Sequence, residues 1–174
     1  MKSYQSKSIS LRYDIKQDRV QWLGLCADNR LASIWISRRM LSALLLKLSQ
    51  WLNKHSEQTF LSASKAKITK EKGSVHRFEH EAAQRQVPVV HEVVSKKQTI
   101  FVEFLLSVLH LTPLNKDSVK LVLSDEKNTY EIYSMMSTNE MHKVLSELLR
   151  LSDSAGWKVP NPWHSNNNQH AVMH

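Results

Sequence analysis

The hydrophobic residues of this chain follow a strand-then-helix order twice, in stretches about a hundred residues apart. In the first stretch, residues 20–25 and 31–36 are short runs rich in β-prone side chains, and the residues between them favour a turn. Ser37 then occupies a position suited to a helix N-cap. Apolar residues recur at the helical period in the segment that follows, at Met40, Leu41, Leu44, Leu45, Leu48, Trp51 and Leu52. The pattern predicts a β-hairpin that leads directly into a long amphipathic helix.

The second stretch repeats this order with different residues. Residues 119–124 and 130–133 form two strand-like runs, and the polar residues 125–128 between them are typical of a turn. Ser137 and Glu140 have the spacing of a capping box, in which each side chain bonds the backbone amide of the other residue. The apolar face of the next helix would be made by Met141, Val144, Leu145, Leu148 and Leu149. A second hairpin and a second helix are therefore expected.

Further strand signals precede each hairpin. Residues 8–13 alternate apolar and polar positions, as in a half-buried strand. Residues 100–111 carry apolar side chains on both strand faces, so we expect one continuous strand that is the most buried in the protein. The fold class predicted is α+β, with two antiparallel β-meander-plus-helix units (βββα twice) packed together and joined by a polar connector. The internal duplication is one of pattern, because few positions match residue for residue.

We expect a single globular domain, because a chain of this length commonly forms one. Its first unit spans residues 1–55, and its second unit spans 99–163 and ends in a Trp-Pro closing segment. Residues 56–98 form a basic polar connector with a short helix near 76–86. Residues 164–174 are rich in Asn and His and are expected to be a disordered tail.

Composition restricts the class of protein further. The hydrophobic content of 41% is enough to fill a core. The N-terminus is polar, and the longest apolar run is too short to cross a bilayer as a helix, so we expect a cytoplasmic protein with no membrane partner. The single cysteine, Cys26, excludes an internal disulfide and a Cys-rich zinc site.

Motifs that carry chemistry are sparse. The three glycines, Gly24, Gly73 and Gly156, lie far apart, so the chain lacks the glycine-rich motifs of nucleotide sites and the nucleophile elbow. Cys26 has no histidine near it in sequence, and an ordinary buried cysteine is the preferred interpretation over a nucleophile. The sequence leans against an enzyme and predicts no cofactor.

One pair of histidines has the spacing of metal ligands. His76 and His80 stand at i and i+4 of the short predicted helix and would point the same way. Arg77 occupies the position where the zinc-protease motif has its glutamate, and a third ligand would have to come from Glu81 or His91. A solvated polar helix explains the spacing more simply, so the pair is a weak metal candidate and no metal is predicted.

The formal net charge of +8 makes the position of the cations informative. Much of the excess lies in the connector, at Lys65, Lys67, Lys70, Lys72 and Arg77, where the alternatives are a solvated linker and contacts to phosphate. Arg38 and Arg39 lie in the first turn of the first predicted helix, where two cations oppose the helix dipole. They are solvated, bridged to the protein's own carboxylates, or in contact with an anion such as nucleic acid.

The five tryptophans fall into two groups. Trp22, Trp35 and Trp51 lie within apolar strand or helix patterns and are expected in the core. Trp157 and Trp163 lie in the closing segment, which either folds back over the protein as a hydrophobic latch or presents an aromatic-proline motif to a partner.

Two functions from different classes agree with these patterns. The first is a non-enzymatic protein–protein interaction or structural protein, with self-association as a homodimer among its forms and Trp157 and Trp163 as candidate contacts. The second is a nucleic-acid-binding protein that uses Arg38, Arg39 and the basic connector on phosphates. An enzyme with an unrecognised site is a weaker third alternative.

Overall fold

The computed structural model describes residues 1–63 and 98–159, with the side chains of its first helix described as far as Lys54. The elements are β1 (Lys2–Asp14), β2 (Arg19–Cys26), β3 (Leu31–Ile36), α1 (Arg38–Ala63), β4 (Ile100–Leu105), β5 (Val108–Pro113), β6 (Ser118–Ser124), β7 (Tyr130–Ser137) and α3 (Thr138–Ser154). The α+β class and the repeated strands-then-helix order are confirmed. The short helix predicted near 76–86 and the tail 164–174 lie outside the described residues.

The two units share one seven-stranded sheet, in the order β4-β3-β2-β1-β7-β6-β5. Residues 2–5 of β1 pair in parallel with β7, while the rest of β1 pairs antiparallel with β2. In the same way β4 pairs in parallel with β3, although it belongs to the second half of the chain. The first strand of each unit therefore begins by pairing with the third strand of the other unit. In the first unit this start is residues 2–5 of β1, which pair with β7, and in the second unit it is β4, which pairs with β3.

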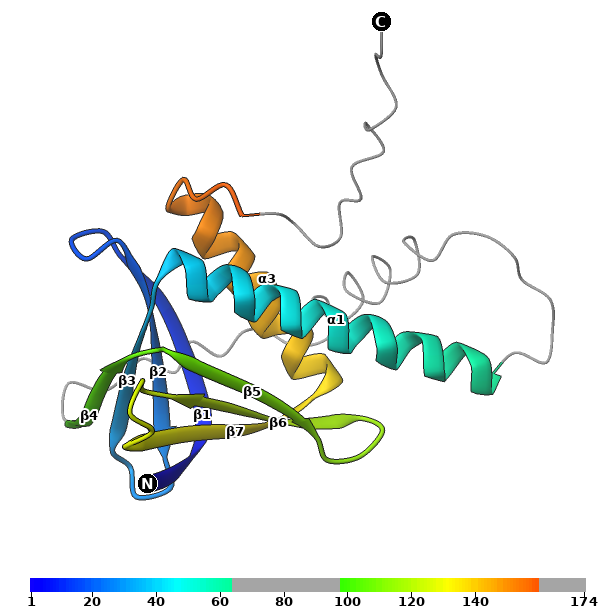
Figure 1. The fold of residues 1–174 in the computed structure, drawn as a ribbon, viewed down its shortest axis with the longest axis horizontal. Coiled ribbons are helices and arrows are strands. Elements are labelled where there is room, and N and C mark those ends of the chain that lie inside the picture. The colour runs from blue at the N-terminus through cyan, green and yellow to red at the C-terminus, as the bar shows by residue number, and fades with distance from the viewer. Residues whose placement is uncertain (64–97, 160–174) are drawn as a thin grey trace, which may run out of the picture.

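The sheet is curled (Figure 1), and its two end strands follow each other directly in the chain. β4 and β5 stand at opposite ends of the strand order, yet only Leu106 and Ser107 separate them in the chain. The amide of Leu106 donates to the carbonyl oxygen of Trp35 on β3 (2.8 Å), and the amide of Ser107 donates to that of Ser124 on β6 (3.1 Å). The junction thus connects the two ends of the strand order, and the green ribbon in Figure 1 runs without interruption from β4 into β5.

The prediction of one highly buried strand over residues 100–111 is wrong on two points. The segment breaks at Leu106 and Ser107 into β4 and β5, and several residues of both strands are exposed. Both strands lie at the ends of the strand order, where they have fewer neighbours to cover them. β2 carries the longest buried run instead, followed by β3 and β6.

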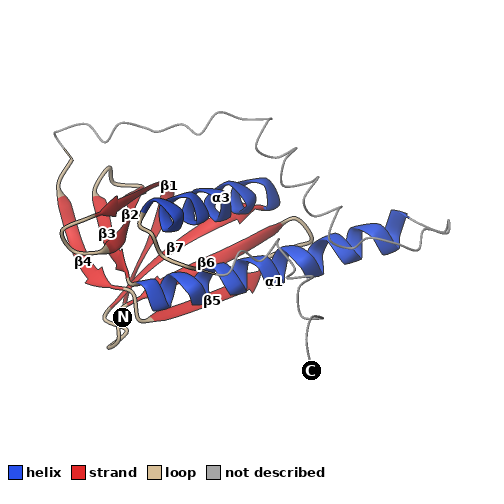
Figure 2. Ribbon diagram, turned by 90° about the horizontal axis from the view of Figure 1, so that it is seen from above, coloured by secondary structure: helices blue, strands red, loops and turns tan. Residues whose placement is uncertain are grey.

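Both helices lie on the same face of the sheet and contact each other (Figures 1 and 2). The core between helices and sheet contains the side chains that the helical and strand periods predicted, among them Val20, Trp22, Ile34, Ile36, Leu41, Leu45, Leu48, Leu121, Ile132, Leu145 and Leu148. Burial of each large apolar side chain stabilises the fold by roughly 1.5–3 kcal/mol. Among the described residues, no helix has both the length and the apolar character needed to cross a membrane.

The helix ends agree with the sequence signals. Ser137 Oγ accepts from the Glu140 amide (3.3 Å) while Glu140 Oε2 accepts from the Ser137 amide (2.7 Å), so the predicted capping box is present. Ser37 Oγ accepts from the Met40 amide at the start of α1 at 3.4 Å, a longer contact. Gly156 has a φ of 67°, the left-handed conformation in which glycine commonly follows the end of a helix.

The chain after α3 folds back onto the turn between β1 and β2. Trp157 is only 5% exposed, and its indole nitrogen donates to Asp18 Oδ1 at 2.9 Å. The Tyr13 hydroxyl donates to the same oxygen at 2.6 Å, and the two rings meet edge to face at 5.8 Å. This position is the one expected of a latch, and Trp163 lies outside the described residues.

Candidate functional site

The structure places the predicted arginine pair on the surface at the start of α1. Arg38 and Arg39 are both exposed, and neither makes a hydrogen bond or ion pair with the described part of the chain. Hydrogen bonds from Tyr13 and Trp157, and then the charge of Arg38, lower the pKa of Asp18. Within the protein, Arg38 therefore helps to stabilise the ionised carboxylate of Asp18.

Most other predicted contact residues belong to the connector. Lys65, Lys67, Lys70, Lys72 and Arg77 lie outside the described residues, as do the metal candidates His76 and His80. Over residues 1–63 and 98–159, no group of three His, Cys, Asp or Glu side chains is arranged to hold a metal ion. The metal candidate and the phosphate contacts of the connector stay predictions.

Cys26 is a buried thiol at the end of β2. Burial raises its pKa, and the negative charge of Asp28 raises it further. A thiol held in its protonated form is a poor nucleophile, because the thiolate is the reactive species. The geometry agrees with an ordinary buried cysteine.

The sequence reasoning missed a polar network on the face of the sheet opposite the helices, which we call the distal face. Side chains alternate along each strand, so the neighbours of core residues such as Trp22, Ile34 and Val102 point to this face. Strand register aligns these neighbours in two rows across β1, β2, β3 and β4. The rows are Arg12, Gln21, Trp35 and Leu105, then Ser10, Leu23, Ser33 and Glu103. Trp35 is therefore a half-buried residue of the distal face, and its predicted place in the core is wrong.

Hydrogen bonds link these two rows across all four strands. Arg12 Nε donates to Gln21 Oε1 (2.5 Å), and Gln21 Nε2 donates to Ser33 Oγ (2.7 Å). Ser33 Oγ in turn donates to Glu103 Oε1 (3.0 Å). The indole nitrogen of Trp35 donates to the same carboxylate oxygen at 2.6 Å. The indole ring is thus held in one orientation by a chain of bonds that begins at Arg12.

The middle of this network is buried. Gln21 is 2% exposed and Ser33 is fully buried, so water cannot replace a lost partner. Leaving a buried polar group without a hydrogen bond lowers the free energy of unfolding by about 1–3 kcal/mol. A movement of one of these side chains would therefore destabilise its neighbours, so their positions are coupled. Beside the network, Leu105 is 43% exposed in the same row as Trp35. The distal face therefore presents an ordered tryptophan next to an exposed leucine.

The two ends of the network keep unused bonding capacity. Arg12 is exposed, and only its Nε has a partner among the described residues. Glu103 is also exposed, and both bonds it accepts end on Oε1. Within residues 1–63 and 98–159, the terminal guanidinium nitrogens of Arg12 and the Oε2 oxygen of Glu103 have no hydrogen-bond partner.

The second unit provides an internal comparison, because its strands have the same arrangement. The positions that correspond to Arg12, Gln21 and Trp35 are held by Thr112, Lys120 and Met135. No equivalent chain of hydrogen bonds joins them in the described part of the protein. The fold forms without such a network in its second half, so the network in the first half is not a requirement of the architecture.

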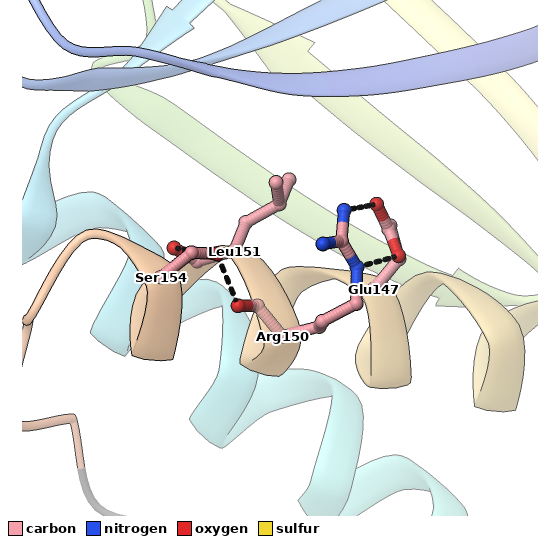
Figure 3. Close-up of polar contacts among 4 residues, drawn as sticks. All are labelled: Glu147, Arg150, Leu151 and Ser154. Carbon is pink, nitrogen blue, oxygen red and sulfur yellow. Dashed lines mark hydrogen bonds and ion pairs between the residues drawn. The ribbon is translucent and has the colours of Figure 1, made fainter.

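Several other cations of the described residues already have partners. The Nζ atom of Lys120 lies 3.7 Å from Glu131 Oε1 and 4.2 Å from the centre of the Tyr133 ring. On α3, Arg150 makes two hydrogen bonds to Glu147, at 2.8 and 2.6 Å, while Leu151 points toward the strands (Figure 3). Arg12 differs from these residues because its hydrogen-bond partner, Gln21, is neutral.

Comparison of the chain with protein-family models, curated proteins and solved structures gives no match. Any function assigned to it must therefore rest on the chemistry of its own residues.

Proposed function

We propose that the protein is a non-enzymatic binding protein that holds a partner protein against the distal face. The observation that supports this most is the hydrogen-bonded network from Arg12 to Trp35, which is buried at its centre and absent from the second unit. A network of this kind adds little net stability, because its gains offset the cost of burying polar groups. Its effect is to fix the orientation of Trp35 before a partner arrives.

The residues around the network have the composition of a protein interface. Trp and Arg are the side chains most enriched among residues that dominate binding energy, and an ordered side chain loses less entropy on binding. Trp35 on β3 and Leu105 on β4 are apolar neighbours in one row. Arg12 lies on β1 in the same row, and Glu103, of opposite charge, lies on β4 in the adjacent row. The partner that fits is a protein surface with apolar side chains facing Trp35 and Leu105, a carboxylate facing Arg12 and a cation facing Glu103.

Capture experiments with matched variants test this function. The full-length protein, its Arg12→Glu and Leu105→Ser variants, and two controls are immobilised and exposed to lysate. Arg39→Glu makes the same charge change at an exposed site on α1, and Leu46→Ser removes a leucine there that is 56% exposed. We expect a partner that the wild type and both controls retain and that both distal-face variants lose. A partner that both distal-face variants retain as well as the wild type does would overturn the proposal. The same holds if neither the wild type nor any variant retains a specific protein.

Nucleic-acid binding is a second candidate, and one observation favours it. Arg38 and Arg39 are exposed in the first turn of α1, which contains no acidic residue, so two unbalanced cations lie at the positive end of the helix dipole. By sequence, residues 64–97 add eight Lys or Arg against four Glu. Titration with DNA and RNA at two salt concentrations tests this, because phosphate contacts predict a steep loss of affinity with salt. No binding at low salt would eliminate this function.

A further inference from the structure

We infer that the partner contributes an extended segment that pairs, as an added strand, with the open edge of β4, an inference that rests on the proposed function. β4 is an end strand of the sheet, and within residues 1–63 and 98–159 its only strand partner is β3. It lies at the left margin of the sheet in Figures 1 and 2. Its other edge therefore has no strand beside it in this part of the chain.

Strand register shows which backbone groups face this edge. The amide of Leu106 donates to the carbonyl oxygen of Trp35 on β3 (2.8 Å), so every second residue back from Leu106 directs its backbone groups toward β3. Glu103 and Leu105 direct theirs the opposite way. Their amides have no acceptor among the described residues, and the carbonyl oxygen of Leu105 accepts only a long bond (3.4 Å) from the Ser107 hydroxyl. Unpaired groups spaced in this way are a template for another strand.

The other end of the sheet shows how this chain closes an edge. On β5 the Lys47 ammonium donates to the carbonyl oxygen of Leu109 at 2.9 Å, and Pro113 has no N–H. Lysine and proline are residues that proteins commonly use to prevent strand addition. β4, with the sequence Ile-Phe-Val-Glu-Phe-Leu, contains neither. Its one charge does not block the edge, because the Glu103 carboxylate is turned toward the sheet, where it accepts bonds from side chains of β3.

The side chains beside this edge define the segment that fits. Glu103 and Leu105 belong to the distal face, so an added strand places two alternate side chains next to them. Glu103 Oε2 has no partner among the described residues, and Leu105 is 43% exposed beside Trp35. The segment therefore carries a basic residue and an apolar residue separated by one position. The residue between them is apolar as well, because it lies next to Phe104, which packs against the core.

Charge favours another protein over a second copy as the source of this segment. β4 carries one anion and no cation, so pairing of two β4 edges would bring two Glu103 carboxylates near each other without a basic residue between them. The segment that fits is one that β4 itself does not supply. The rest of the partner then lies over the distal face toward Arg12, as the proposed function requires.

Hydrogen exchange and peptide titration, followed residue by residue by NMR on the full-length protein, test the inference. The probe is a synthetic peptide with Lys-Val-Val-Val-Lys at its centre, which presents the required order in either strand direction, and its control has Glu in place of Lys. In the free protein the amides of Glu103 and Leu105 should exchange fast, and those of Val102 and Phe104, which bond β3, slowly. At about ten times its Kd, the lysine peptide should slow the first pair by about tenfold. The glutamate peptide should bind about fivefold more weakly or worse.

Matched changes separate strand pairing from other contacts. N-methylation of either of two alternating sets of peptide amides removes donors from one edge of the peptide strand only, so one set should abolish binding and the other should leave it. In the protein, Glu103→Gln keeps an acceptor for Ser33 and Trp35 but removes the charge, so the preference for the lysine peptide should disappear. Asp153→Asn makes the same charge change at an exposed site on α3 and should leave the preference unchanged.

Equal effects of the two methylated sets, or peptide binding that leaves the amides of Glu103 and Leu105 unchanged, would contradict the inference. The same holds if these amides are already protected in the free protein. Protection that rises with protein concentration would assign the edge to a second copy, and protection at every concentration would assign it to the protein's own chain. A protein that retains a partner from lysate through Arg12 and Leu105 but binds no peptide would overturn only the strand pairing. A protein that binds neither would overturn the proposed function too.

Discussion

Removal of the Trp157 ring should lower the stability of the whole protein, because this side chain packs across two distant parts of the fold. Trp157 is 5% exposed, contacts the Tyr13 ring and donates to Asp18 from the far end of the sequence. Replacing a buried tryptophan with alanine costs about 3–5 kcal/mol. For a chain of this size each kcal/mol shifts Tm by roughly 2–4 °C.

Urea unfolding followed by circular dichroism measures this effect. Trp157→Ala should lower the midpoint without changing the denaturant slope, which indicates a change of stability rather than of the amount of surface exposed. Trp157→Phe is the matched variant, because it keeps an aromatic ring but cannot donate to Asp18. Its free energy of unfolding should fall clearly less than that of Trp157→Ala. A loss of less than about 1 kcal/mol for Trp157→Ala would show that the segment contributes no latch. The alternative interpretation, an aromatic-proline contact for a partner, would then be favoured.

Three further predictions concern single positions. Gly24→Ala should cost about 1–3 kcal/mol, because a Cβ there would lie 2.8 Å from Ser6 Oγ and 3.1 Å from Ser6 Cβ, and adding Ser6→Ala should recover part of the loss in the same unfolding assay. Ser137→Ala should cost about 1 kcal/mol through loss of the capping box, and Ser37→Ala, which lacks a reciprocal glutamate, should cost less; similar losses would contradict this. Asp18→Asn should lower Tm more at pH 7 than at pH 3. The lowered pKa of Asp18 means that its carboxylate stabilises the fold fully above about pH 4 and loses this effect as the pH falls through the folded pKa, so an equal deficit at both pH values would refute the argument.

The elements of this fold could be predicted because their signals are local. Two-residue and 3.6-residue periods, turn residues and the Ser137 to Glu140 spacing each act over a few positions, and the structure confirms them. The exchange of first strands could not be predicted, because the choice of a partner strand depends on residues about a hundred positions away. Nor does a run of apolar residues reveal that Leu106 and Ser107 divide it between two partners.

The distal network could have been noticed in part. Gln21 interrupts an apolar run and Ser33 interrupts another, and strict alternation from Ile34 and Ile36 assigns Trp35 to the face away from the core. Because both faces of β2 and β3 are buried, the sequence pattern gave no polar face to follow. The identity of the acceptor, Glu103, depends on the parallel pairing of β4 with β3, which only the structure supplies.

The shared sheet also predicts that neither half of the chain folds alone. In a fragment that ends within residues 64–97, β3 lacks its partner β4, and in the complementary fragment β7 lacks residues 2–5 of β1. Each fragment would then expose a strand edge and half of the core, which favours aggregation. We expect the two fragments to be unfolded or insoluble when expressed separately, and to form a one-to-one complex with a cooperative thermal transition when expressed together. A soluble, cooperatively folded fragment would show that each βββα unit is an independent domain and that the strand exchange is dispensable.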